Sequence, residues 1–587
     1  MDRGLLPLRP TQRRWPILGA GPLALVPLAI QAILVGSVCL GLLFLILPAL
    51  GYLPALGKSA FDFAPLRAAL AYPGLIAAMI ATLISGVLAT VVALLLALGL
   101  IAVLDPLGLG DRGGGRWLRR SMLALIATPH IAIAIGLAFL LSPSGWLIRI
   151  AAQFLAIDQA PDYLLVNDRH GLALALALAI KETPFILAVA LSALRRIDAE
   201  PQLRLCRSLG YSASAAWPKI VLPQLYRLIR MPVFAVLAYG LSVADMAIIL
   251  GPSLPPTLPV LILRLIADPD LASRLTASGA GLLQIGLVLA AFLLWRGAEG
   301  LCAWAAHRAV TRGRRDLPTS LRWIARLLIL AAGVGVLVLG LASIAGVAVW
   351  SITEVWRFPE ALPARFSLAT WIRVFGGLAD PLWNSLALAF ATSGIAMVAA
   401  VACLELEDRL GAVAARRSQW ILFLPLFAPE MGFLFGLQIA ASAGGLTGTV
   451  GAMLWFHLLF VFPYVFLTLS EPWRALDGRY ARAARCLGAG RWRVLLRVKA
   501  PLLRAPLALS LAVGLTVSLV LYLPTVLAGA GRITTLATET VALYGSGDRR
   551  VLGVYALLQT MLAAAIFGAA ILAGRPRLFG RKPPAMP

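Results

Sequence analysis

The sequence Arg204-Leu-Cys-Arg-Ser-Leu-Gly210, followed by nine residues and Ile220-Val-Leu-Pro223, recurs about 278 residues later. The second copy reads Arg482-Ala-Ala-Arg-Cys-Leu-Gly488, nine residues, and Val498-Lys-Ala-Pro501. The spacing between glycine and proline is identical in the two copies. A shared pattern of this length indicates an internal repeat, so we interpret the chain as two copies of one unit.

The similarity extends to both sides of the repeated segment. Each copy has an aspartate just before it, a proline followed by an aromatic residue in the preceding apolar stretch, and a proline that starts an apolar stretch further upstream. These residues are Asp198 and Asp477, Pro184-Phe185 and Pro463-Tyr464, and Pro129 and Pro429. Two such units in parallel imply a pseudo-two-fold axis along the membrane normal, with a path between the halves.

The composition places the chain in a membrane. Of its 587 residues, 60% are hydrophobic and 13% are charged, and the mean hydropathy is +0.90, which no soluble domain of this size reconciles with a solvated surface. Stretches of about 20 apolar residues are long enough to span a bilayer. We predict an all-α polytopic protein with about twelve spans, near 26–50, 73–104, 119–142, 172–194, 231–251, 277–298, 320–350, 383–404, 419–441, 447–470, 504–528 and 551–574.

The distribution of positive charge predicts the orientation. The net charge is +25, and with a cytoplasmic N-terminus the predicted inner loops hold 34 Lys and Arg residues against 12 in the outer loops. The positive-inside rule therefore predicts a bacterial inner-membrane protein with both termini in the cytoplasm. Because the excess of positive residues follows the pattern of cytoplasmic loops in a membrane protein, it gives no reason to expect a nucleic-acid partner.

The repeated segment is predicted to be helical without spanning the membrane. Leu203, Leu205, Cys206 and Leu209 form a short apolar stripe at helical spacing, and Gly210 permits a left-handed stop. A second helix towards Pro223 would complete a rigid elbow on the inner face. Such an elbow on each half could receive force from two soluble partners.

The repeated pattern resembles the EAA loop of binding-protein-dependent ABC import permeases. In this pattern a glycine is followed, after nine residues, by Ile-x-Leu-Pro. The resemblance implies a type I importer permease fold and a helix that docks on an ATPase subunit. The coupling residues that it implies are Arg204, Leu205, Cys206, Gly210, Ile220, Leu222 and Pro223 in the first copy, and Arg482, Ala483, Ala484, Gly488, Val498 and Pro501 in the second. Arginine stands at Arg204 and Arg482, where the family usually has glutamate, so we hypothesise that the ATPase offers an acid there.

The resemblance also implies the partners of the chain. It implies two ATPase subunits that bind the ATP, a periplasmic or extracellular substrate-binding protein, and a chain that is not an enzyme and binds no cofactor. The fused arrangement is most similar to permeases of the ferric-iron, thiamine and polyamine group, and thiamine, iron, polyamine or sulfate would all fit as cargo. We assign the first half to 1–298 with a core at 73–298, a cytoplasmic linker to 299–319, and the second half to 320–587 with a core at 380–574.

Ionisable residues inside predicted spans are candidates for the translocation path, because burying them in a membrane is costly. Glu182, beside Lys181, and Asp245 are such residues. Two alternatives are that Lys181 and Glu182 neutralise each other, or that Asp245 caps a broken helix. Asp245 has no acidic counterpart in the second copy, and the four histidines have no zinc-site spacing, so we predict no metal site.

A secondary active transporter with two parallel six-span halves is the main alternative function. It would carry its own coupling ions and need no ATPase. The feature shared by the two copies is an elbow on the inner face, which favours the ATP-driven importer. The outer segment 152–171 either contacts a binding protein or is a solvated loop.

Overall fold

The computed structural model describes residues 25–104, 113–313, 319–410, 422 and 424–575. In the first half it contains α1 (Leu25–Ala49), α2 (Ala64–Leu70), α3 (Leu75–Leu104), α4 (Gly113–Ile126), α5 (His130–Leu141), α6 (Trp146–Leu155), α7 (Leu172–Leu194), α8 (Ala199–Ser208), α9 (Ala213–Gly240), α10 (Asp245–Leu250), α11 (Leu258–Ala267) and α12 (Ser273–Thr311). A short 3-10 turn covers Pro54–Leu56. The predicted linker 299–319 begins as helix, because α12 continues to Thr311, and 314–318 lie outside the described residues.

The second half repeats this order of helices. It contains α13 (Thr319–Ser351), α14 (Ala369–Leu410), α16 (Leu424–Phe427), α17 (Glu430–Ala443), α18 (Val450–Ala475), α19 (Gly478–Cys486), α20 (Arg491–Val494), a π-helical turn (Leu495–Lys499), α21 (Ala500–Leu502), α22 (Arg504–Val520), α23 (Leu523–Gly529), α24 (Leu536–Tyr544) and α25 (Arg549–Gly574). The two short strands β1 (Thr353–Val355) and β2 (Arg365–Phe366) form an antiparallel hairpin. The fold is all-α, as predicted.

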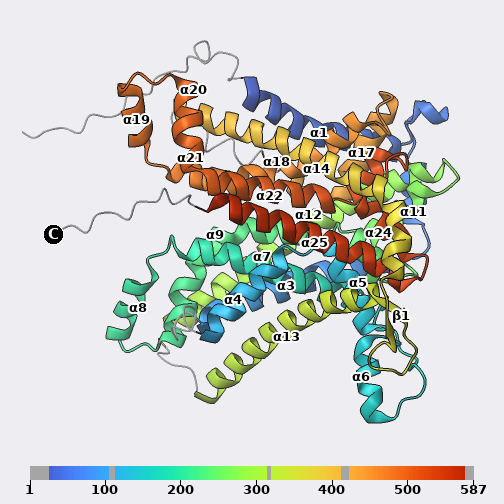
Figure 1. Ribbon diagram of the computed structural model, residues 1–587, viewed down its shortest axis with the longest axis horizontal. Coiled ribbons are helices and arrows are strands. Elements are labelled where there is room, and N and C mark those ends of the chain that lie inside the picture. The colour runs from blue at the N-terminus through green and yellow to red at the C-terminus, as the bar shows by residue number, and fades with distance from the viewer. Residues whose placement is uncertain (1–24, 105–112, 314–318, 411–421, 423, 576–587) are drawn as a thin grey trace, which may run out of the picture.

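Ten helices in the described part are long and apolar enough to cross a membrane, and an eleventh span is added if the bent pair α20–α21 and α22 counts as one. These eleven cover eleven of the twelve predicted spans. The remaining prediction, 419–441, falls on α16 and α17, while 419–421 and 423 lie outside the described residues. Figure 1 shows the long helices running side by side in one bundle.

Four predicted spans are broken in the middle, two in each half. In the first half α4 and α5 are separated at 127–129, and α9 and α10 at 241–244. In the second half the equivalent breaks lie at 428–429 and at 521–522. Pro129 and Pro429 lie at two of the breaks, directly before α5 and α17. Proline interrupts the preceding helix there because it lacks the N–H that would continue the helical hydrogen bonds. Broken helices inside a membrane protein are tolerated where they face protein or a water-filled space.

The two halves are interlocked through their first helices. α1 of the first half packs along α17 of the second, and α13 of the second half packs along α5 of the first. Glycine allows both contacts: a Cβ on Gly436 would overlap the Gly41 carbonyl oxygen, and a Cβ on Gly136 would overlap the Ser343 carbonyl oxygen. The first helix of each half thus packs on the other half, and the two contacts are equivalent under the pseudo-two-fold symmetry.

We expect Gly436→Val to destabilise the protein by about 2 kcal/mol or more, because the added side chain would force α1 away from α17. The midpoint of thermal unfolding of the detergent-solubilised chain measures this. Gly286→Val is the matched control, since Gly286 lies in α12 with no atom within 4 Å of an added Cβ. Equal midpoints for the two variants would contradict the close packing of α1 on α17.

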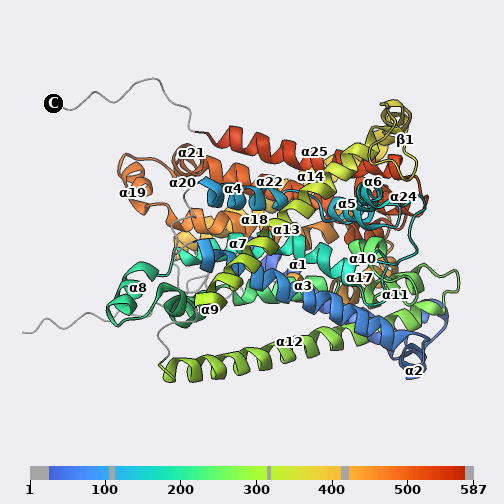
Figure 2. The same ribbon diagram turned by 90° about the horizontal axis from the view of Figure 1, so that it is seen from below.

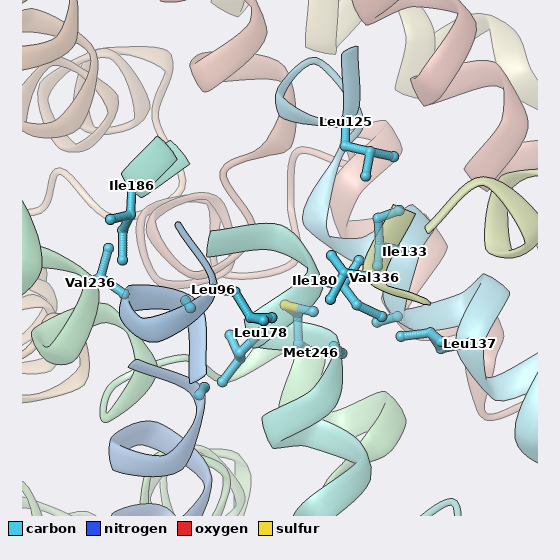
Figure 3. Packing of buried hydrophobic residues seen from close by; sticks show 14 of the residues in the cluster. Leu96, Leu125, Ile133, Leu137, Leu178, Ile180, Ile186, Val236, Met246 and Val336 are labelled. Atoms are coloured by element: carbon cyan, nitrogen blue, oxygen red, sulfur yellow. The ribbon is translucent and has the colours of Figure 1, made fainter. Parts of the chain in front are cut away.

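The core of the first half also draws on helices far apart in sequence. Ile133 of α5, Ile180 of α7, Met246 of α10 and Val336 of α13 belong to one buried cluster. Figure 3 shows Ile133, Ile180 and Val336 turned toward one another, with Met246 nearby. The cluster packs against α10 through Met246 and so helps to hold this short helix in place.

Equivalent hydrogen bonds occur in both halves. The Thr82 hydroxyl of α3 accepts a hydrogen bond from the Leu258 N–H at the start of α11, at 2.9 Å. In the second half the Ser385 hydroxyl of α14 accepts one from the Leu536 N–H at the start of α24, at 2.8 Å. Each hydroxyl satisfies a buried helix N-terminus from a neighbouring span. The internal repeat thus extends from sequence spacing to side-chain chemistry.

Candidate functional site

The first elbow, residues 198–223, has the predicted left-handed stop. α8 ends in a Schellman motif, in which Gly210 adopts φ +83° and its N–H donates to the Arg207 carbonyl at 3.0 Å. The Tyr211 N–H donates to the Cys206 carbonyl, also at 3.0 Å. The Ser212 side chain then accepts from the Ala215 N–H and starts α9. Glycine is required here because its backbone adopts positive φ without strain.

The second elbow, residues 477–503, repeats this geometry. Gly488 adopts φ +79°, its N–H donates to the Arg485 carbonyl at 3.0 Å, and the Ala489 N–H donates to the Ala484 carbonyl at 3.0 Å. At the start of α19 the Asp477 carboxylate accepts from the Arg479 N–H at 2.8 Å. The repeated sequence therefore encodes one helix-turn-helix conformation twice.

The predicted coupling residues lie on the surface of the two elbows or just beneath it. Arg204, Leu205, Gly210, Pro223, Arg482, Ala483, Gly488 and Pro501 are exposed, and Cys206, Ile220, Leu222, Ala484 and Val498 are half-buried. Arg204 pairs with Glu200 of its own helix at 3.2 Å. Arg482 forms no ion pair with any residue that the structure describes.

Each elbow also presents an apolar tip. Leu209 and Leu487 occupy the same position, directly before the left-handed glycine, and are 58% and 88% exposed. The sequence predicts Leu209 as part of a short apolar stripe, whereas Leu487 is not among the predicted coupling residues. The sequence signal that could have identified Leu487 is its position in the repeat, which matches that of Leu209. The repeat therefore places an exposed leucine at the same position of both elbows.

The two elbows differ in the helix that follows. In the first half α9 runs without interruption through Pro218, Pro223 and Pro232 to Gly240. The predicted helix towards Pro223 is present in this copy and continues past the proline. In the second half the helix contains the π-helical turn and then bends by 82° at Leu503.

A buried ionic network holds the bend in the second elbow. The Lys499 ammonium lies 2.6 Å from carboxylate oxygens of both Glu405 and Asp408, at the end of α14. The Trp473 indole donates to Asp408 at 3.0 Å, and Arg474 pairs with Glu407 at 2.8 Å. Repeat spacing puts Val221, which has no charge, at the position of Lys499 in the first half. This anchoring is therefore specific to the second half.

Both elbows lie at the same end of the bundle. Figures 1 and 2 show α8 and α19 together at the left end, whereas α6, α11 and α24 lie at the right end. Near the elbows Arg196 of the first half forms an ion pair with Glu471 of the second. The two elbows thus lie on the same face of the molecule, as expected for two repeats with parallel orientation.

Ionisable and phenolic side chains of both halves also occur at or near the breaks in the spans. We call this set the polar centre, and it consists of His130, Glu182, Tyr239, Asp245, Glu430, Tyr464 and Tyr522. His130, Asp245 and Glu430 begin α5, α10 and α17, and Tyr522 directly precedes α23. We predicted only Glu182 and Asp245 from the sequence. The equivalent Pro129-His130 and Pro429-Glu430 were the available signal for Glu430.

Lys181 and Glu182 turn to different partners. The Lys181 ammonium donates to the carbonyls of Leu125 and Ile126, both at 2.9 Å, and to that of Thr128. It therefore caps the free carbonyls at the end of α4. The Glu182 carboxylate lies 3.5 Å from the His130 imidazole. Lys181 and Glu182 form no direct ion pair with each other among the described residues, and their mutual neutralisation stays a prediction.

Asp245 opens α10 and accepts a hydrogen bond from the Met246 N–H at 2.8 Å. The predicted broken helix is present, with the break before Asp245 and a further stop at Gly251. A cavity of about 300 Å³ lies beside this helix, lined by Ala247, Ile248, Pro252, Ser253, Val260, Leu263, Arg264 and Ala267. None of the carboxylates of the polar centre lines it, so we do not assign it to the path.

The comparisons with known proteins fit this architecture. No family model matches the chain. The chain is 31% identical over 515 residues to the inner membrane ABC transporter permease protein YnjC of Escherichia coli, covering 87% of this chain and 90% of the relative. It is 27% identical over 217 residues to the transport system permease protein PhnV of Salmonella paratyphi A, covering 36% of this chain and 80% of the relative. PhnV thus matches over most of its own length but corresponds to little more than one third of this chain. This is expected if the present chain fuses two permease units. From these matches and the two-repeat helical fold we conclude that the chain belongs to the permease family of binding-protein-dependent ABC importers.

Proposed function

We propose that the two elbows each bind one copy of a separate ATPase subunit and transmit its movement to the spans. The observation that carries this proposal is the pair of Schellman elbows at one end of the bundle, each with an exposed leucine at Leu209 or Leu487. An apolar tip on a rigid helix-turn-helix can insert into a groove of a partner, and its burial there stabilises the complex. ATP binds to the ATPase subunits, and this chain contributes no cofactor site.

The interlocked halves support a rocking movement as the transport step. α1 and α13 each cross to the opposite half, so both halves share packed surfaces through which a shift at one elbow reaches the other. Closure of two ATPase subunits would draw the elbows together and open the path at the opposite end of the bundle. The chain itself breaks no bond in this cycle.

We assign the elbow end to the cytoplasm and the opposite end to the periplasm, where a substrate-binding protein would dock. The support is the excess of Lys and Arg in the loops at the elbow end. At the other end the Arg149 guanidinium, 3% exposed, donates to the Arg357 carbonyl at 2.6 Å and ties α6 to the segment 353–366. This tie gives the binding protein a rigid surface built from both halves.

The outer segment 152–171 has a structural role in this arrangement. The Asp168 carboxylate accepts hydrogen bonds from the N–H groups of Leu172 and Ala173, both at 2.9 Å, and so caps α7. Residues 152–155 belong to α6. We propose that the remainder of this segment contributes to the contact with the binding protein.

Co-purification tests the proposed assembly. The tagged chain, purified from its native membrane, should retain two ATPase subunits through size-exclusion chromatography, and native mass spectrometry would count them. Its ATP hydrolysis in proteoliposomes should rise when the loaded binding protein is added. Transport by the chain alone in liposomes would instead identify a secondary transporter.

We expect Arg482→Glu to lower binding-protein-stimulated ATP hydrolysis by about 3- to 10-fold, because the exposed guanidinium lacks an ion-pair partner within the described chain and is free to meet an acid of the ATPase. Arg274→Glu, an equal charge reversal at an exposed position near the start of α12, is the control. Equal activity in the two variants would count against an acidic partner for Arg482.

A further inference from the structure

The helix α6 exposes apolar side chains and turns its one charged residue inward. Arg149 and Ala152 lie on one side of the helix and are 3% and 6% exposed. Leu147, Ile150 and Phe154 recur at the spacing i, i+3 and i+7, which places them together on the opposite side. They are 42%, 42% and 83% exposed. Because water is a poor solvent for such a side, we expect another apolar phase to cover it.

Contacts on the buried side hold α6 in this orientation. The Arg149 guanidinium donates to the Arg357 carbonyl at 2.6 Å, and its carbon atom lies 4.9 Å from the centre of a ring of Trp356. The Trp146 indole donates to the Ala361 carbonyl at 3.0 Å. All three partners belong to the β1–β2 hairpin and its loop. Rotation of α6 to bury its apolar side would break these contacts, so the fold itself keeps that side exposed.

α6 projects sideways from the bundle at the end opposite the elbows. In Figure 1 the long helices run from left to right, whereas α6 runs downward across their direction, on the side of the bundle where α13 lies. Figure 2, seen from below, shows α6 close to end-on, with α13 also on the near side. By length and composition α5 and α6 together would suffice for one span, but residues 142–145 separate them and α6 leaves the direction of the bundle. A helix that crosses the direction of the spans at their ends lies in the plane of the membrane.

The side of the bundle from which α6 projects is apolar. On α13 the side chains of Leu328, Val334, Val338 and Leu341 are between 42% and 64% exposed. Aliphatic side chains exposed along a span contact the acyl chains of the bilayer, which are as apolar as leucine. α6 therefore adjoins a surface that lipid covers.

The chain becomes polar directly after α6. Ala156 ends the helix with φ +48° and is followed by Asp158, Gln159 and Asp162, which are all exposed. Their charged and amide groups require water, which places α6 at the boundary between lipid and water and not within the hydrocarbon. In the second half α17 joins α18 through 444–449 with no helix between them, so this feature belongs to the first half.

We propose that α6 is an interfacial helix, whose apolar side lies in the lipid leaflet at the end opposite the elbows. Its partner is the boundary between headgroups and acyl chains, which accepts the apolar side of an amphipathic helix. This contact needs no particular headgroup, because the exposed side of α6 carries no charge. Arg149 holds the hairpin instead of a lipid phosphate. The helix and the hairpin together resist movement of this end of the first half along the membrane normal.

A spin label on the apolar side of α6 tests the contact with lipid. Phe154→Cys is introduced into the full-length chain, whose five native cysteines are replaced, and is labelled with a nitroxide in nanodiscs of phosphatidylethanolamine and phosphatidylglycerol. Electron paramagnetic resonance then measures relaxation of the label by oxygen, which concentrates among acyl chains, and by a neutral nickel chelate, which stays in water. We expect oxygen to act more strongly than the chelate at position 154, and also at position 150 after Ile150→Cys.

Gln159→Cys is the matched control, because Gln159 is exposed in the polar segment just beyond α6. There the nickel chelate should act more strongly than oxygen. Stronger action of the chelate at position 154 would place α6 in water, as for a surface reserved for a binding protein, and would overturn the proposal. Weak action of both reagents at position 154 would also overturn it, because another protein surface would then cover the helix. The measurement needs no ATPase, so its failure would leave the proposed coupling untouched.

Discussion

Leu487→Asp should abolish stable association of the permease with its ATPase, with a loss of affinity of at least about 100-fold. Leu487 is 88% exposed at the tip of the second elbow, so the substitution leaves the isolated chain intact. In the complex it removes a buried leucine side chain, which contributes about 1.5–3 kcal/mol, and it adds a carboxylate that must lose its water. The amount of ATPase retained by the tagged chain measures the effect.

Leu164→Asp is the matched control for this experiment. Leu164 is 77% exposed and lies in the segment between α6 and α7, at the other end of the bundle. It should retain ATPase at the level of the unmodified chain. Leu209→Asp on the first elbow should weaken association as well, since Leu209 occupies the equivalent position. Full retention of ATPase by both elbow variants would show that the tips do not contact it.

Lys499→Met should destabilise the protein by about 3 kcal/mol and disconnect the second elbow from its span. Lys499 is 6% exposed and pairs with Glu405 and Asp408, so within the described chain its loss leaves Asp408 without a cation and Glu405 with Arg409 as its only cation. Asp408 is partly exposed, which places the effect at the lower end of the range for a broken buried pair. We expect a lower midpoint of thermal unfolding, and ATP hydrolysis that no longer drives transport.

Removal of the acids together with the lysine separates charge balance from mechanical coupling. Lys499→Met with Glu405→Gln and Asp408→Asn should recover most of the lost stability, because the acids are removed with the lysine and only the partly exposed Arg409 loses its ion-pair partner. Transport should stay low if the ionic contact itself carries movement from the elbow to α14. Normal transport in Lys499→Met would contradict a role for this network in coupling, and an unchanged midpoint of thermal unfolding would contradict its role in stability.

The elbows could be predicted from sequence because their geometry is local. Gly210 and Gly488 stop a short helix through contacts within a few residues, so the repeated spacing determines the same turn twice. The apolar stretches were also predictable, since a span is defined by its own length and composition. Their breaks were visible in part as Pro129 and Pro429.

The features missed by sequence reasoning depend on contacts between distant residues. The exchange of α1 and α13 rests on close approach of Gly436 to Gly41, 395 positions earlier in the chain. Arg196 pairs with Glu471 only because the halves face each other. In the sequence Lys499 resembles any other basic residue of an inner loop. Its role becomes visible only in the fold, where Glu405 and Asp408 of α14 lie beside it. Nothing in local periodicity distinguishes such residues from ordinary surface charges.

Labelling of the elbow at its native cysteine tests the central claim most directly. Cys486 is exposed in the second elbow, so a chain that keeps Cys486 and has its other four cysteines replaced carries a single reporter thiol. A membrane-impermeant maleimide should label it in inside-out vesicles and not in right-side-out vesicles, and bound ATPase should protect it. Labelling in right-side-out vesicles, or equal labelling with and without ATPase, would contradict the account.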